Sequence, residues 1–182
     1  ALREVMRNVV EHSESTRIAY CAQYWPTRKR VEIGINDWGI GLAASLRKNP
    51  ELLVPSETDA ISLALMPGIS GRGAIVRRLK HRDEWTNSGY GLYMTSRAAR
   101  KAGTFLIGSG SAALMLSGPQ SYPIHWEYPG TAVRMEFFID RIDDLKSTLA
   151  QFRRDADDFC RVNAGTALTP SVASQMLARD FA

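Results

Sequence analysis

The hydrophobic positions along the chain change between helical and strand spacing and so divide the chain into elements. In the first twelve residues, Leu2, Val5, Met6, Val9 and Val10 recur every three or four positions. This spacing predicts one buried face of an amphipathic helix. No capping residue precedes the helix. We therefore expect the chain to belong to a longer protein, with a further region or domain before Ala1.

Two strand-like segments follow and are joined by a turn. Residues 17–25 are rich in Ile, Tyr and Trp, and residues 30–36 alternate between apolar and polar side chains. Pro26-Thr27-Arg28-Lys29 lies between them, so the pattern predicts an antiparallel hairpin. Short helices are then predicted over 42–48 and 59–66, the second ended by Pro67-Gly68.

The middle of the chain predicts a loop, a helix and three strands. Residues 67–91 are punctuated by glycine and carry basic side chains, which is typical of a mobile loop. A helix is predicted over 92–102, ending at Gly103. Strands are predicted over 104–107 and 112–116, separated by Gly108-Ser109-Gly110-Ser111, and over 131–139 after a proline-containing loop.

The C-terminal part predicts helices without strands. Residues 140–158 form a charged helical pattern and residues 170–181 form another. We therefore expect a domain over 1–140 and a helical extension over 141–182. The predicted domain is an α/β (α+β) two-layer sandwich, in which a mixed, mostly antiparallel sheet carries helices on one face.

Composition narrows the class of protein but names no function. The chain has 182 residues, of which 45% are hydrophobic and 23% are charged, as in ordinary globular proteins. No apolar run approaches the roughly 18 residues of a spanning helix, so we expect no membrane segment. The two cysteines, Cys21 and Cys160, suit neither a metal site nor a disulfide framework, which favours a reducing, cytoplasmic location.

The net charge of +4 comes largely from basic residues at 28–30 and 72–82. Clusters of this kind bind nucleic acid in some proteins, but in loops they are usually solvated. Nucleic acid is therefore not expected as a partner.

The stretch Asp37-Trp38-Gly39-Ile40-Gly41 directly follows the strand pattern of residues 30–36. One carboxylate and two glycines at a strand end suit a loop through which a ligand approaches the backbone. The same glycines are equally suited to an ordinary turn. The stretch alone does not decide between these interpretations.

Four motifs in the order of one family decide in favour of a ligand. Residues 2–138 resemble the ATP-binding domain of the GHKL superfamily, which has the Bergerat fold and includes gyrases, heat-shock chaperones, mismatch-repair ATPases, histidine kinases and anti-sigma factor kinases. The matching stretches are Glu4-Val5-Met6-Arg7-Asn8 with Glu11-His12-Ser13, Asp37-Trp38-Gly39-Ile40-Gly41, Gly89-Tyr90-Gly91-Leu92 and Gly130-Thr131.

The resemblance implies ATP and Mg²⁺ as ligands and gives the first motif a metal and a catalytic role. Asn8 would coordinate Mg²⁺ bridging the ATP phosphates, since Mg²⁺ prefers oxygen ligands. Glu4, one helical turn away, would orient or deprotonate an attacking water. Without the later motifs, the solvated side of an amphipathic helix is the better explanation for both residues.

The other motifs are implied to hold the nucleotide. Asp37 would accept a hydrogen bond from the adenine amine, while Gly39 and Gly41 leave room for the base and sugar. Thr131 would support the same contact, although it also suits an ordinary strand. Gly89, Gly91 and Leu92 open a helix whose free N–H groups suit phosphate, and residues 67–90 occupy the position of the family's ATP lid.

Three functions fit this resemblance. Glu4 favours ATP hydrolysis that is coupled, through the lid, to a protein partner or a missing domain. The second function is a kinase of the histidine-kinase or anti-sigma type. Glu11 disfavours this function, because histidine kinases commonly carry a basic residue at that position. The third is a non-enzymatic module in which ATP shifts a lid equilibrium.

Overall fold

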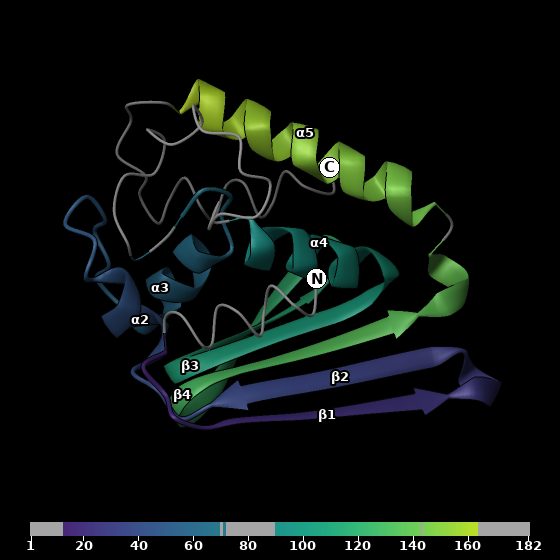
Figure 1. The fold of residues 1–182 in the computed structure, drawn as a ribbon, viewed down its shortest axis with the longest axis horizontal. Coiled ribbons are helices and arrows are strands. Elements are labelled where there is room, and N and C mark those ends of the chain that lie inside the picture. The colour runs from purple at the N-terminus through teal and green to yellow at the C-terminus, as the bar shows by residue number, and fades with distance from the viewer. Residues whose placement is uncertain (1–12, 70, 72–89, 143, 164–182) are drawn as a thin grey trace.

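The computed structural model describes residues 13–69, 71, 90–142 and 144–163 of the chain. The predicted helices over the first twelve residues and over 170–181 lie outside these ranges, as does most of the predicted lid. The described part is an α+β fold that contains a four-stranded sheet and helices (Figure 1).

The strands are β1 (Ile18–Trp25), β2 (Arg30–Asp37), β3 (Gly103–Ser117) and β4 (Gln120–Phe138). They are arranged in the order β1-β2-β4-β3. All three pairings are antiparallel, so in the described residues the sheet is antiparallel rather than mixed. A short 3₁₀ turn, Pro26–Arg28, and Lys29 with its left-handed φ of 44° close the predicted hairpin between β1 and β2.

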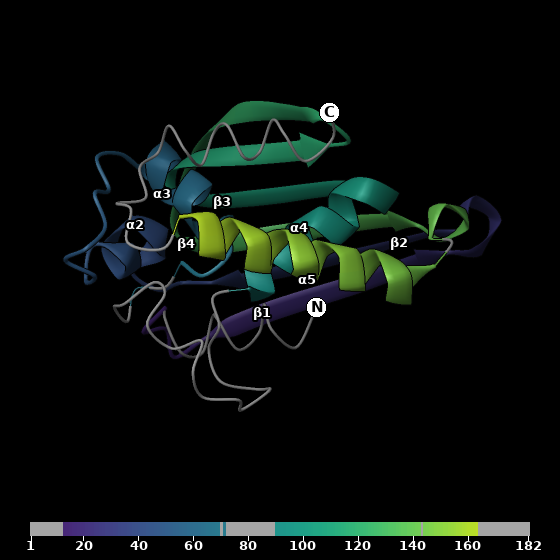
Figure 2. The same ribbon diagram turned by 90° about the horizontal axis from the view of Figure 1, so that it is seen from above.

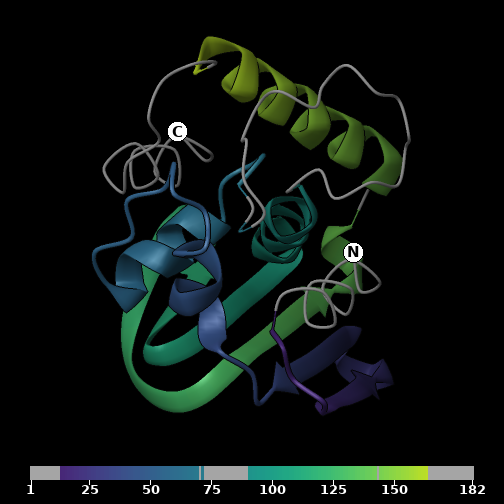
Figure 3. The same cartoon turned by 60° about the vertical axis from the view of Figure 1, so that its left-hand side comes forward.

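The prediction of two strands over 104–107 and 112–116 was wrong, because β3 runs continuously from Gly103 to Ser117. The glycine-rich stretch between them bends the strand instead of ending it. Gly110 has a φ of +59°, and the register with β4 shifts on both sides of it. A bulge of this kind adds curvature to a sheet, and Figure 3 shows β3 and β4 curving together around the helices.

Strand β4 also begins earlier than predicted, and it includes Pro123 and Pro129. Only residues 132–138 of β4 pair with β2, so the first half of the strand pairs with β3 alone among the described residues. Pro129 falls in the register shift, between Tyr128 and Thr131. Proline lacks an N–H and is tolerated at such edges and bulges.

Four described α-helices accompany the sheet: α2 (Gly41–Leu46), α3 (Glu57–Ala64), α4 (Gly91–Ala102) and α5 (Leu145–Val162). Helices α2, α3 and α4 lie on one face of the sheet, as predicted (Figures 1 and 3). Ser56 caps α3 by accepting a bond from the Asp59 N–H at 3.1 Å, and Asp144 caps α5 through the Ser147 N–H.

The core forms between this helical layer and the inner face of the sheet. Its main cluster joins buried strand residues such as Phe105, Ile107 and Met135 to Ile61 of α3 and Ala99 of α4. A second cluster joins α2 and α3 to the segments on either side of α3, which contribute Leu52, Val54, Met66 and Ile69. Burial of these apolar side chains stabilises the fold at about 25 cal/mol per Å², and it fixes the helices relative to the strand ends.

Helix α5 adds a further layer above α4, and its course over α4 is visible from above in Figure 2. It begins later than predicted, because residues 139–141 form a 3₁₀ turn first. Phe152, Ala156 and Cys160, spaced four residues apart, are all buried. Arg97 of α4 is paired with Asp155 of α5 at 3.5 Å, so this part of the predicted extension packs directly on the domain.

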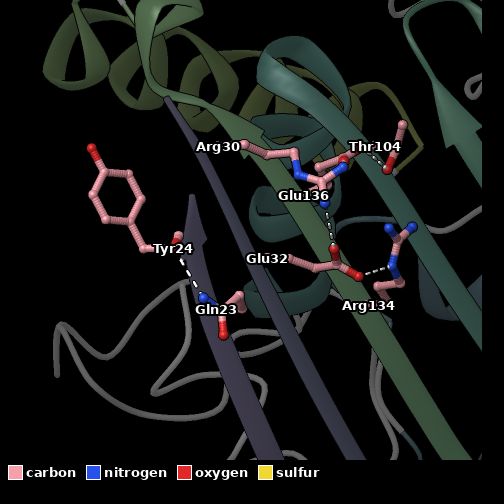
Figure 4. A network of polar contacts seen from close by, with 7 residues as sticks. All are labelled: Gln23, Tyr24, Arg30, Glu32, Thr104, Arg134 and Glu136. Atoms are coloured by element: carbon pink, nitrogen blue, oxygen red, sulfur yellow. Dashed lines mark hydrogen bonds and ion pairs between the residues drawn. The ribbon is translucent and has the colours of Figure 1, made fainter. Parts of the chain in front are cut away.

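The outer face of the sheet carries a network of polar contacts that joins charged side chains of β2 and β4 to Thr104 of β3 (Figure 4). Arg30 Nη1 donates to Glu136 Oε1 at 2.9 Å, and Thr104 Oγ1 donates to Glu136 Oε2 at 3.1 Å. Arg134 donates through Nε to Glu32, which lies across the β2–β4 pairing. The hydrogen bond from Arg134 holds the pKa of the Glu32 carboxyl below its ordinary value, against the opposing effect of burial.

Replacing Glu32 by Gln should make the free energy of unfolding change less with pH in the acid range. Because the folded state lowers this pKa, the ionised carboxylate stabilises the fold above its unfolded pKa. That contribution is lost as pH falls through the folded pKa. Urea unfolding should therefore find Glu32→Gln less stable than wild type at pH 7, with the difference shrinking from about pH 5 downward.

Glu127→Gln is the matched control, because the Glu127 side chain is 82% exposed. Its pH dependence should follow that of wild type. A constant difference between Glu32→Gln and wild type at every pH would contradict the role of Glu32.

Candidate functional site

The candidate site is built around Asp37, the last residue of β2. Asp37 is 1% exposed, so its carboxylate needs hydrogen-bond donors. Oδ1 accepts from the Gly39 N–H at 2.8 Å and from the Thr131 N–H at 3.3 Å. Both bonds go to Oδ1, so within the described part of the chain Oδ2 is left to accept a further donor.

Burial raises the pKa of Asp37 above its ordinary value, and the bonds from Gly39 and Thr131 oppose this rise. In its ionised form the Asp37 carboxylate only accepts hydrogen bonds. The site can therefore recognise a group that presents an N–H donor to it.

The backbone of the loop after Asp37 is fixed by bonds from both sides. The Trp38 N–H donates to Ser15 Oγ at 3.3 Å, and the Ile40 N–H donates to the Ser13 carbonyl at 2.8 Å. On the other side, the Leu42 N–H donates to Ser109 Oγ at 2.8 Å. The loop is thus held between residues 13–15 and strand β3.

Three glycines around Asp37 are required by close approach of the backbone. A Cβ at Gly39 would lie 2.0 Å from the Ser13 carbonyl oxygen, and one at Gly130 would lie 2.0 Å from the Asp37 carbonyl oxygen. Gly41 has a φ of +76°, and a Cβ there would meet Ser109 Oγ at 2.9 Å. Since no larger residue fits, these glycines shape the site as well as the turn.

Thr131 and Ser109 bring β4 and β3 to the same place. They are paired in the sheet register, and their hydroxyl oxygens lie 3.5 Å apart. Ser109 is fully buried. The sequence placed Thr131 here by resemblance but missed Ser109, whose only signal was its position between two glycines in a stretch interpreted as a loop.

Helix α4 begins at Gly91, as the third motif predicts within one residue. Leu92 of its first turn packs on the main core cluster, and so does Leu42, which follows the Asp37 loop. The cluster also contains Ile35, which lies two residues before Asp37 in β2, and Val133, which lies two residues after Thr131 in β4. The start of α4 therefore lies over the same end of the sheet as Asp37.

Trp38 is half exposed and contacts the ring of Tyr128. Its ring centroid lies 6.3 Å from that of Tyr128, and the Tyr128 hydroxyl accepts a bond from Asn36 Nδ2 at 2.7 Å. Asn36 and Asp37 are neighbours in β2, so their side chains face opposite sides of the sheet. The Trp38 ring thus supports the loop from the outer face.

Glu4, Asn8 and Gly89 lie outside the described residues, so their predicted roles stay predictions. Among the residues that the structure describes, no group of three or more His, Cys, Asp or Glu side chains could hold a metal ion. The structure thus brings together Asp37, Gly39, Gly41 and Thr131, with Gly91 and Leu92 at the same end of the sheet.

The chain matches no family model and no curated protein at a significant level. Of the helices described by the structure, none has the length and apolar character needed to cross a membrane.

Gly130→Ala should destabilise the protein, because the added methyl would lie within 2.8 Å of Asp37 Oδ1 and closer still to the Asp37 backbone. Forcing atoms into a packed site costs roughly 1–3 kcal/mol, and the loss can be measured as a fall in the free energy of unfolding in urea. Gly34→Ala is the control, since its methyl meets the side-chain Sγ of Cys21 at 3.1 Å. Equal stability of the two variants would show that Gly130 does not set the approach to Asp37.

Proposed function

We propose that this chain is an ATP-binding domain of the GHKL type, with a Bergerat fold, that hydrolyses ATP with Mg²⁺. Hydrolysis would be coupled through the lid segment to a protein partner or a further domain. The proposal combines the resemblance of the four motifs with the geometry around Asp37.

One observation carries the proposal: the bond between the Thr131 N–H and Asp37 Oδ1. The two residues are 94 positions apart in sequence, and they belong to the two motifs that the resemblance assigns to adenine. An adenine amine is an N–H donor, and Asp37 Oδ2 suits it as an acceptor; guanine has a carbonyl at that edge. The backbone N–H of Thr131 reaches Asp37, and the Thr131 hydroxyl would suit a second polar contact to the base.

The surroundings of Asp37 support the same arrangement. Ser13 ends the first motif, and its carbonyl receives the Ile40 N–H of the second motif. The third motif opens α4 at the same end of the sheet. Tyr90, at the N-cap of α4, makes no side-chain capping bond. The N-terminus of a helix suits phosphate, because it carries partial positive charge.

The remaining roles in the proposal rest on the resemblance. Asn8 would hold Mg²⁺, Glu4 would activate water, and Gly89 would leave room for the phosphates beside Gly91. When bound, Mg²⁺ would neutralise the developing charge on the phosphates.

Asp37→Asn should weaken ATP binding by roughly tenfold or more, because the amide has one acceptor oxygen and presents N–H donors to the adenine amine. Isothermal titration with ATP and GTP checks this, and wild type should prefer ATP. Asp140→Asn is the control, since Asp140 is exposed and lies outside the site. Unchanged ATP affinity in a folded Asp37→Asn variant would remove the adenine assignment.

Glu4→Gln should bind ATP as wild type does and release phosphate much more slowly, since an amide cannot accept a proton from water. Phosphate release and ATP affinity are measured on the same preparations. Equal release by both proteins would remove Glu4 from the mechanism. Transfer of the γ-phosphate to protein without free phosphate would instead favour the kinase alternative.

A further inference from the structure

Three polar side chains from three neighbouring strands form a row at one end of the sheet. Thr131 of β4 is paired with Ser109 of β3. On the other side of β4, the pairing with β2 runs as far as Asn36 with Ala132, so the next residue of each strand places Asp37 level with Thr131. Opposite residues of an antiparallel pair project from the same face of the sheet. Asp37, Thr131 and Ser109 therefore lie side by side on one face.

This polar row borders the apolar core. Two residues further along the three strands, the same face carries Ile35, Val133 and Ile107, which all belong to the main core cluster. Ser109 is fully buried beside them. A buried hydroxyl costs free energy unless it is hydrogen-bonded, so both the oxygen and the proton of Ser109 need partners.

The partners of Ser109 give its hydrogen bonds a direction. Its Oγ accepts the Leu42 N–H at 2.8 Å. Its own proton still needs an acceptor, and in the described part of the chain the oxygen in place for it is Thr131 Oγ1, 3.5 Å away. When Ser109 donates to Thr131, the Thr131 hydroxyl must direct its own proton elsewhere, because a hydroxyl carries a single proton.

Thr131 is the member of the row that a ligand can reach most readily. It is partly exposed, whereas Asp37 and Ser109 are buried. Its backbone N–H is used by Asp37 Oδ1, so its hydroxyl is the donor that it can offer to a ligand. The row thus combines an acceptor, the Asp37 carboxylate, with a donor that Ser109 orients.

An acceptor beside a donor matches the edge of adenine and mismatches that of a 6-oxopurine. Adenine offers its amine as a donor and its N1 as an acceptor, whereas hypoxanthine and guanine offer a carbonyl and an N1–H. To accept that N1–H, the Thr131 hydroxyl would have to turn its proton away from the base. If it turned toward Ser109, the buried Ser109 proton would lose its acceptor, which is costly.

We propose that Ser109 is a positioning residue of the nucleotide site, which fixes the Thr131 hydroxyl as a hydrogen-bond donor and so favours adenine over 6-oxopurines. This inference rests on the proposed function. Ser109 acts on the base through Thr131, and it also holds the Leu42 N–H at the end of the Asp37 loop. The second contact supports any base equally, whereas the first distinguishes between bases.

The test compares ATP with inosine triphosphate, whose base is hypoxanthine, by isothermal titration against the whole chain. Wild type should prefer ATP, and Ser109→Ala should reduce the ratio of the two affinities about fivefold, the value of one ordinary hydrogen bond. Thr131→Val should reduce the ratio similarly. Ser109→Ala added to Thr131→Val should reduce it no further, because Ser109 acts through Thr131. Ser96→Ala is the matched control: Ser96 is 2% exposed, and its hydroxyl donates to the Tyr93 carbonyl at 2.9 Å.

Thermal unfolding shows which variants are folded. If Ser109→Ala is not, Ser109→Cys takes its place, since a thiol of similar shape is only a weak donor, and the ratio should again fall. Equal losses for the two nucleotides, a further fall in the double variant, or a wild type without preference would overturn the role of Ser109, while ATP binding by wild type would keep the proposed function. If wild type does not bind ATP, the proposed function fails and the role of Ser109 fails with it.

Discussion

The burial of one carboxylate constrains the end of the sheet at which the candidate site lies. Asp37 is almost completely removed from solvent, and an ionised group there is costly unless donors reach it. Those donors are backbone N–H groups of Gly39 and Thr131. To deliver them, the loop must fold back sharply after β2, and β4 must pass close to it. Gly39 and Gly130 follow from this requirement, because a side chain at either position would collide with the backbone that carries Asp37 or Ser13.

The bend of β3 and β4 belongs to the same arrangement. Ser109 lies immediately before the register shift at Gly110, and its hydroxyl receives the Leu42 N–H while facing Thr131. The bulge therefore directs a buried hydroxyl at the loop, and beyond it the two strands curve around the helices. Without the bulge, the two strands would not form this curved wall around the helical layer. The irregularity thus shapes the site and the fold together.

Local patterns predicted the elements that depend on nearby residues, and they failed where distant partners decide. The β1–β2 hairpin and helix α4 follow from the alternation in residues 30–36 and from Gly103 at the helix end. The continuity of β3 through Gly108 and Gly110 does not, because it requires β4 alongside. Similarly, Pro123 and Pro129 indicate a loop until one knows that this half of β4 lacks β2 as a neighbour. Asp37 and Thr131 were predicted from motif order, whereas the only signal for Ser109 was its position between two glycines.

Asp37 and the start of α4, the two ends of the candidate site, are stabilised by different interactions. The end at Asp37 relies on backbone donors and on glycines, so its geometry is set by the sheet itself and tolerates little substitution. The start of α4 lacks a side-chain cap and depends on contacts with α5 through Tyr90. A helix end held by side chains from a separate layer can be displaced without disturbing the sheet. Loss of the contact between Tyr90 and α5 would therefore disturb the start of α4 before it disturbs the bonds around Asp37.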